Sequence, residues 1–288
     1  MTKSPVIDRY FACVGAQKAG TTWLARTLAR HDEIFVTPVK EIHYFDHVAG
    51  LTEHLAERKR RSRYRKYHQR MWAQWGRWRE HRAQADWYRA YMKPGLDDEW
   101  YASLFADRQG KAVAGEATPE YAIIGRDGFR HMKTLAPDAR IIYIMRNPVT
   151  RAWSQLLHQC RSRRLNPDRV SSETFLSMAG EERFEELADY ERVLDDMAAE
   201  FAPSQTLLAF YEDIHHDRAA AVRSVCDFLG VGFDGARMDG LGKRYNISPP
   251  AKLPDELREA LREKYGGVVE GIARRMGRIP QSWQTDFN

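Results

Sequence analysis

Hydrophobic positions follow two alternating patterns along the chain. Short, nearly continuous apolar runs are typical of strands that are buried on both faces of a parallel sheet. They occur at Tyr10–Gly15, 111–115, 141–145 and Thr206–Phe210, and a further short strand is expected just before Glu41. Longer stretches with helical periodicity follow these runs, at 21–31, 149–161, 181–201, Arg218–Leu229 and 254–276. The alternation predicts a three-layer α/β fold around a central parallel sheet of about five strands.

The pattern contains no linker, so we expect residues 1–288 to form a single domain. The stretch from about 50 to 108 separates the second expected strand from the third. It is too long for a simple connection and is rich in helix-forming sequence, so we expect a helical insertion.

Charge is distributed unevenly. The chain has 45 Lys and Arg against 40 Asp and Glu, a net charge of +5. Residues 58–79 hold ten basic residues and no acid, which leaves the rest of the chain slightly acidic. Aromatic and apolar residues recur within this basic block at helical spacing: Tyr64, Tyr67, Met71, Trp75 and Trp78. Three explanations remain open: a stripe docked on the core, capture of an anionic acceptor, or peripheral contact with a membrane surface. No nucleic-acid-binding motif accompanies the block, so we expect no nucleic acid partner.

Several classes of protein are excluded. No apolar run approaches the roughly 20 residues of a membrane span, and residues 1–10 lack the apolar core of a signal peptide. Cys13, Cys160 and Cys226 have neither metal-ligand spacing nor a disulfide pattern. We therefore expect a cytoplasmic protein with free thiols and no metal, with any membrane association limited to the basic block.

The first strand runs into a glycine-rich turn followed by a helix. Its sequence is Gly15-Ala-Gln-Lys-Ala-Gly-Thr-Thr-Trp23. A turn of this kind directs backbone N–H groups at one point, and the helix dipole adds positive potential, which suits a phosphate. Its lysine, Lys18, lies inside the loop instead of after the second glycine as in an ATP-binding P-loop. No acid follows the strand at 141–145 to hold Mg²⁺, because Arg146 stands there.

Arg146 suggests a second anion site. It follows a strand, and Asn147-Pro148 then starts a helix that carries Ser154. Ligands of open α/β sheets bind at the carboxyl ends of the strands, where this arginine is expected.

Together, GAQKAGTTWL and MRNPVTRAWSQLLH resemble the sulfotransferases that use 3′-phosphoadenosine 5′-phosphosulfate (PAPS) and release PAP. The block Lys40-Glu-Ile-His-Tyr-Phe45 is most similar to the carbohydrate branch, which includes the heparan sulfate N- and O-sulfotransferases. The resemblance implies a P-loop-like fold and a nucleotide site made by the first loop, the Arg146 segment and a late closing loop. The cofactor-binding residues that it implies are Gly15, Gln17, Lys18, Ala19, Gly20, Thr21, Thr22, Trp23, Arg146, Ser154, Lys243, Arg244 and Tyr245.

The resemblance also implies catalytic roles. Glu41 corresponds to the general base, Lys18 to the cation on the leaving phosphate, and His158 to a histidine that lines the site. His43 either orients Glu41 or acts itself; the two would lie on one side of an extended chain. Glu116 and Tyr121 are expected to shape the acceptor pocket.

The predicted function is transfer of a sulfuryl group from PAPS to a hydroxyl, in preference to an amine, of a carbohydrate or other small acceptor. A P-loop nucleotide kinase or NTPase is the first alternative, and the position of Lys18 argues against it. A basic module that binds membranes or polyanions through 58–79 is the second. The oligomeric state is left open.

Overall fold

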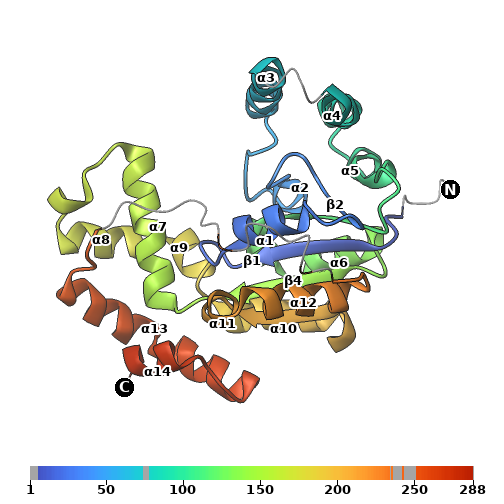
Figure 1. Cartoon of the computed structure of the whole chain (residues 1–288). Helices are drawn as coiled ribbons and strands as arrows, with labels where there is room; N and C mark the ends of the chain where they lie inside the picture. The colour runs from blue at the N-terminus through green and yellow to red at the C-terminus, as the bar shows by residue number, and fades with distance from the viewer. Residues whose placement is uncertain (1–5, 74–77, 234, 236–241, 243–250, 288) are drawn as a thin grey trace.

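A five-stranded parallel sheet lies at the centre of the computed structural model (Figure 1). Its strands lie in the order β2-β3-β1-β4-β5, and every neighbouring pair is parallel. Their bounds are β1 (Tyr10–Gly15), β2 (Ile34–Val36), β3 (Val113–Ala117), β4 (Arg140–Met145) and β5 (Thr206–Phe210). The structure describes residues 6–73, 78–233, 235, 242 and 251–287, and only the backbone of 70–73, 78–81 and 83.

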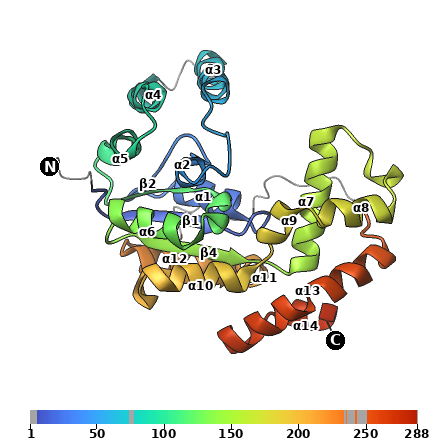
Figure 2. The same ribbon diagram turned by 180° about the vertical axis from the view of Figure 1, so that it is seen from behind.

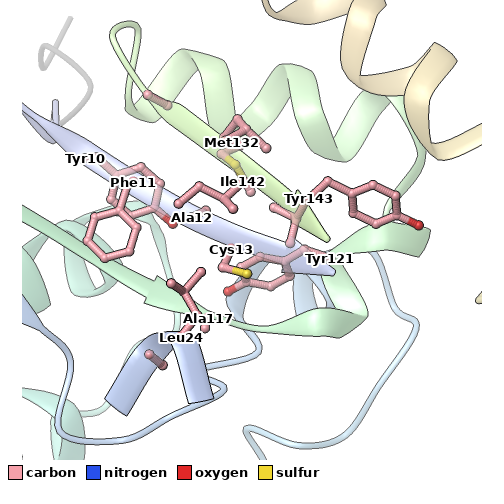
Figure 3. Packing of buried hydrophobic residues seen from close by; sticks show 14 of the residues in the cluster. Tyr10, Phe11, Ala12, Cys13, Leu24, Ala117, Tyr121, Met132, Ile142 and Tyr143 are labelled. Carbon is pink, nitrogen blue, oxygen red and sulfur yellow. The ribbon is translucent and has the colours of Figure 1, made fainter. Parts of the chain in front are cut away.

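Helices cover both faces of the sheet. Helices α1 (Thr21–Leu28) and α12 (Arg218–Leu229) lie on the face seen in Figure 1. Helices α6 (Gly125–Leu135) and α10 (Tyr190–Glu200) lie on the face seen in Figure 2. Figure 3 shows the result at the central strand, where Leu24 of α1 and Met132 of α6 pack on opposite sides of β1. The predicted three-layer α/β fold is confirmed.

The helix that follows β4 illustrates how the sequence sets an element boundary. Asn147 caps α7 (Pro148–Arg163), since its side chain accepts from the N–H groups of Val149 and Thr150. Pro148 occupies the first helical position, where its missing N–H costs nothing. This cap fixes the direction in which α7 leaves the sheet.

The strand predicted at 111–115 lies at Val113–Ala117, and two predicted helices differ from the structure by more than two residues. The helix predicted at 21–31 ends at Leu28. The helix predicted at 181–201 is two helices, α9 (Glu182–Glu186) and α10. The prediction was wrong here because Asp189 interrupts the pattern: its side chain accepts from the N–H of Arg192 and starts α10.

Residues 50–108 form the predicted helical insertion. It contains α3 (Glu57–Ala73), α4 (Trp78–Met92) and α5 (Asp98–Ala106), which stand over the sheet at the top of Figure 1. The remaining elements are η2 (Pro119–Ile123), α2 (Tyr44–Val48), α8 (Ser172–Ala179), α11 (Tyr211–His216), α13 (Asp255–Met276) and α14 (Gln281–Phe287), with short 3₁₀ turns at Pro167–Arg169 and Pro203–Gln205.

The aromatic stripe of the basic block packs inside this insertion. Tyr67 stacks on Tyr88 of α4 with 4.2 Å between ring centroids, and Tyr64 lies beside them. Of the other stripe residues, Trp75 lies outside the described residues, as do the side chains of Met71 and Trp78. For the described part, the structure favours docking of the stripe between two helices.

No helix in the described part of the chain is long and apolar enough to cross a membrane.

Candidate active site

A cleft of about 1340 Å³ opens where the strands end. Every strand contributes lining residues through the segment that follows its carboxyl end, as expected for an open parallel sheet. In strand order from β1 to β5, these residues include Lys18, Glu41, Glu120, Arg146 and Tyr211. The predicted residues that line the cleft are Gln17, Lys18, Gly20, Thr21, Thr22, Trp23, Glu41, His43, Arg146, Ser154 and His158. Sequence segments that are far apart therefore meet in one place.

The glycine-rich loop is shaped by close approaches. A Cβ atom on Gly15 would lie 2.5 Å from the ring of Tyr143, so only glycine fits without displacing that ring. Gly20 has a φ of 86°, in the left-handed region that favours glycine, and it caps α1. Ala19, within the loop, is fully buried, and neither Gly15 nor Ala19 lines the cleft. The loop thus brings Lys18 and the first turn of α1 to the cleft surface.

Arg146 joins the two predicted anion-binding segments. Its Nη1 donates to the carbonyl of Lys18 at 2.9 Å, and its Nε donates to Thr150 Oγ1 at 3.1 Å. The guanidinium also stacks on Tyr211, 4.6 Å from the ring centroid. Ser154 and His158 follow along α7 and line the same cleft. The second segment is therefore fixed directly against the first.

Positive charges crowd this side of the cleft. Burial, together with the charges of Arg146 and Arg161, lowers the pKa of Lys18. Burial, followed by the charges of Lys18 and Arg161, also lowers the pKa of His158, which leaves its imidazole neutral at pH 7. A bound anion would relieve the repulsion among these cations, so this side of the cleft is suited to phosphate groups.

The loop after β2 forms the opposite wall. Glu41 and His43 have φ angles of 63° and 66°, in the left-handed region, so the expectation of an extended chain was wrong. Their side chains nevertheless converge, with Glu41 Oε2 4.0 Å from His43 Nε2. Two buried side chains hold this backbone, because the Ile42 N–H donates to Glu116 Oε2 at 3.1 Å and the Tyr44 N–H donates to the Tyr121 hydroxyl at 3.0 Å.

Glu116 and Tyr121 are both fully buried and do not line the cleft. Glu116 accepts from the hydroxyls of Tyr101 at 2.6 Å, Tyr121 at 2.7 Å and Thr118 at 2.6 Å. They lie under the Glu41 loop and hold its backbone, so that they shape this part of the cleft without lining it.

Glu41 and Glu120, two of the carboxyls that line the cleft, differ in their electrostatics. Burial raises the pKa of Glu41, but its ion pair with Lys40 outweighs burial and the pKa is lowered, so Glu41 is ionised at pH 7. Glu120 is 8% exposed, and burial followed by the negative charge of Glu41 raises its pKa. Different environments thus shift the pKa values of two neighbouring carboxyls in opposite directions.

Sequence reasoning missed several residues of the cleft wall, including Glu120, His54 and Arg63. Glu120 could have been found, because it closely follows the third expected strand as Glu41 follows the second. Arg63 belongs to the basic block but gives no signal that separates it from its neighbours. The predicted residues Lys243, Arg244 and Tyr245 lie outside the described residues.

Comparison with known proteins identifies the class. The sulfotransferase family model matches residues 11–235, so the chain belongs to the sulfotransferase family. The prediction of a PAPS-dependent sulfotransferase is thereby confirmed at the level of family and enzyme class, and the kinase and NTPase alternative is set aside. No curated protein matches this chain.

Solved structures share the fold. The sulfotransferase from Alicyclobacillus acidocaldarius is 23% identical, with a TM-score of 0.65, over 95% of this chain and 98% of that one. The sulfotransferase domain of the curacin biosynthetic pathway is 14% identical, with a TM-score of 0.55, over 96% and 99%. The sulfotransferase domain of the Synechococcus PCC 7002 olefin synthase is 18% identical, with a TM-score of 0.52, over 92% and 97%.

Proposed function

We propose that the cleft binds PAPS between the glycine-rich loop and Arg146 and transfers its sulfuryl group to a hydroxyl of a carbohydrate or other small acceptor. The 5′-phosphosulfate lies on Lys18 and the first turn of α1, and the 3′-phosphate lies between Arg146 and Ser154. The observation that carries this proposal is the hydrogen bond from Arg146 Nη1 to the Lys18 carbonyl, which joins the two segments in one cleft. At about 1340 Å³, the cleft has room for a nucleotide and an acceptor together.

The proposed reaction is an in-line displacement at sulfur. The acceptor oxygen forms a bond to sulfur while the bond from sulfur to the 5′-phosphate oxygen breaks, and the acceptor proton passes to Glu41. Charge develops on the departing PAP, and Lys18 lies in the loop where that phosphate is held. The ionised state of Glu41 at pH 7 makes its carboxylate available as the general base.

Two histidines have supporting roles in this proposal. His43, 4.0 Å from Glu41, orients the carboxylate and shares the proton that it receives. His158 is neutral and lines the cleft on the Lys18 side, where its N–H donates to the transferring group. Lys243, Arg244 and Tyr245 remain predicted members of a loop that closes over PAPS.

The Glu41 side of the cleft, which we call the acceptor side, supports a polar acceptor. Glu120, Arg63 and His54 provide polar groups on the Glu41 side of the cleft. Arg63 gives this wall a cation, which favours an acceptor that carries negative charge.

Calorimetric titration with PAP tests the nucleotide site. Lys18→Ala and Arg146→Ala should each weaken PAP binding by about 2 kcal/mol or more, roughly 30-fold, because each removes a charged partner of a phosphate. Arg163→Ala is the matched control: it removes an arginine from the exposed end of α7 that does not line the cleft, and it should leave PAP affinity unchanged. Unchanged PAP affinity in both cleft variants would contradict the proposal.

A separate experiment, in which radiolabelled PAPS is offered to fractionated glycans, lipids and metabolites, would identify the acceptor.

A further inference from the structure

Three side chains converge on one point at the acceptor side of the cleft. One ligand atom each from Glu41, His43 and Glu120 lies within 4.8 Å of the others. Glu41 and His43 follow β2, whereas Glu120 belongs to η2 after β3. His43 is 2% exposed and Glu120 is 8% exposed, so the cluster is set into the wall of the cleft and is not a group of surface acids.

Glu120 also has an unused acceptor atom. Its Oε1 accepts from Gln17 Nε2 at 3.0 Å, but its buried Oε2 has no hydrogen-bond partner among the described residues. Buried carboxyl oxygens are almost always paired, since an unsatisfied one loses its interactions with water without replacement. The unpaired oxygen is therefore available to a ligand that enters the cleft.

Each of the three side chains is oriented by a neighbour that leaves one atom for the shared point. His43 donates from Nδ1 to the buried Asp46 at 2.8 Å, which leaves the lone pair on Nε2 toward Glu41. Gln17 holds Glu120 through Oε1, and Lys40 holds Glu41 through Oε1. Partners of this kind, which orient a histidine through its other nitrogen and a carboxylate through its other oxygen, are characteristic of metal ligands.

We propose that Glu41, His43 and Glu120 bind a divalent cation of the Zn²⁺ class. An imidazole nitrogen and two carboxylate oxygens are ordinary zinc ligands at about 2.0–2.2 Å in a tetrahedral arrangement. Glu41 Oε2 and His43 Nε2 are 4.0 Å apart, so a bound cation would draw these two atoms somewhat closer together. Two carboxylates balance its charge. The cation would occupy the lone pairs at Glu41 and His43, so a bound cation and a free base exclude each other at this site.

Titration of the full-length protein with ZnCl₂, after treatment with a chelator and without PAPS or acceptor, tests this site. We expect one equivalent to bind and EDTA to remove it. Glu120→Gln should weaken binding at least tenfold, because it removes a charged ligand, and Asp46→Asn should weaken it about 10- to 100-fold by releasing the His43 ring. Glu181→Gln is the control, since Glu181 also lines the cleft but lies outside the cluster, and its zinc affinity should match that of the unmodified chain.

Absence of zinc binding, or equal zinc affinity in Glu120→Gln and the unmodified chain, would overturn the proposal. Melting temperature and PAP affinity show whether each variant is folded, and Glu120→Gln remains decisive if Asp46→Asn unfolds. Because the titration uses neither PAPS nor acceptor, its result is independent of the proposed function.

Discussion

The two walls of the cleft are held in place by different means. The first wall consists of the glycine-rich loop and the Arg146 segment, and we call it the donor wall after the ligand proposed for it. Its segments continue directly from the central strands β1 and β4, and one hydrogen bond from Arg146 to the Lys18 backbone joins them. The second wall contains Glu41 and His43, and we call it the acceptor wall after the proposed acceptor. Its loop follows the short edge strand β2 and depends on side chains that reach it from β3 and η2. The donor wall is thus set by the sheet and the acceptor wall by a buried polar network. Four substitutions test this difference.

Glu41→Gln should have the largest effect. It keeps the shape of the side chain but removes the base, so kcat should fall about 10²- to 10⁴-fold while PAP affinity is unchanged. Steady-state kinetics with radiolabelled PAPS, together with calorimetry, measure both quantities. Glu53→Gln removes an exposed carboxylate from the same region and serves as the control. A parallel loss of PAP affinity would show that the two walls are not separate.

Glu116→Gln should disturb the acceptor wall through its support. The amide nitrogen of glutamine would face buried donors that now share the Glu116 carboxylate, so the free energy of unfolding should fall by about 3 kcal/mol. Turnover should fall as the Glu41 loop shifts, with PAP affinity preserved in the folded fraction. Denaturant unfolding measures the first effect, and Glu99→Gln on the exposed side of α5 should produce neither.

Tyr121→Phe removes one link of the same network. The Tyr44 N–H loses its acceptor and Glu116 loses one donor, so we expect a loss of about 2 kcal/mol in the free energy of unfolding and a smaller loss of turnover. The matched variant is Tyr143→Phe, since the buried Tyr143 hydroxyl has no hydrogen-bond partner in the described part of the chain. If both variants lost equal stability, the Tyr121 hydroxyl would have no special role.

Arg63→Ala should have the smallest effect and the most selective one. We expect KM for an anionic acceptor to rise about fivefold, or about 1 kcal/mol, because a partly exposed cation contributes modestly. KM for a neutral acceptor and affinity for PAP should be unchanged. Arg61→Ala, which removes a largely exposed arginine from the same helix, is the control. An equal rise in KM for both acceptors would indicate a general change of shape and not a charge contact.

The donor wall could be predicted from the sequence because the residues that form it lie close together along the chain. Gly15, Lys18 and Gly20 lie within six residues, and Arg146 and Ser154 lie eight residues apart on one strand end and helix. Three strands could be predicted for the same reason, since β1, β4 and β5 are each a compact, mainly apolar run. The family model matches residues 11–235, which include both segments.

The acceptor wall could be predicted only in part. Glu41 and His43 were recognised, but nothing in their residue types indicates left-handed backbone, and the extended chain was the ordinary expectation. The network beneath them joins residues that are 74 positions apart, Ile42 and Glu116, and 103 positions apart, Gln17 and Glu120. Such pairings arise from the order of strands in the sheet, which periodicity does not specify.

The buried Arg60 anchors the basic insertion where it begins. Arg60 of α3 is 5% exposed and donates to the carbonyls of Tyr91 and Lys93 at the end of α4, so it fastens the base of the two-helix unit. One turn further along α3, Arg63 donates to the Tyr91 hydroxyl and lines the cleft. The base of the unit therefore sets the position of the cleft cation. Arg65 and Lys66, further along α3, are exposed, so we expect that their charge can change without moving that cation.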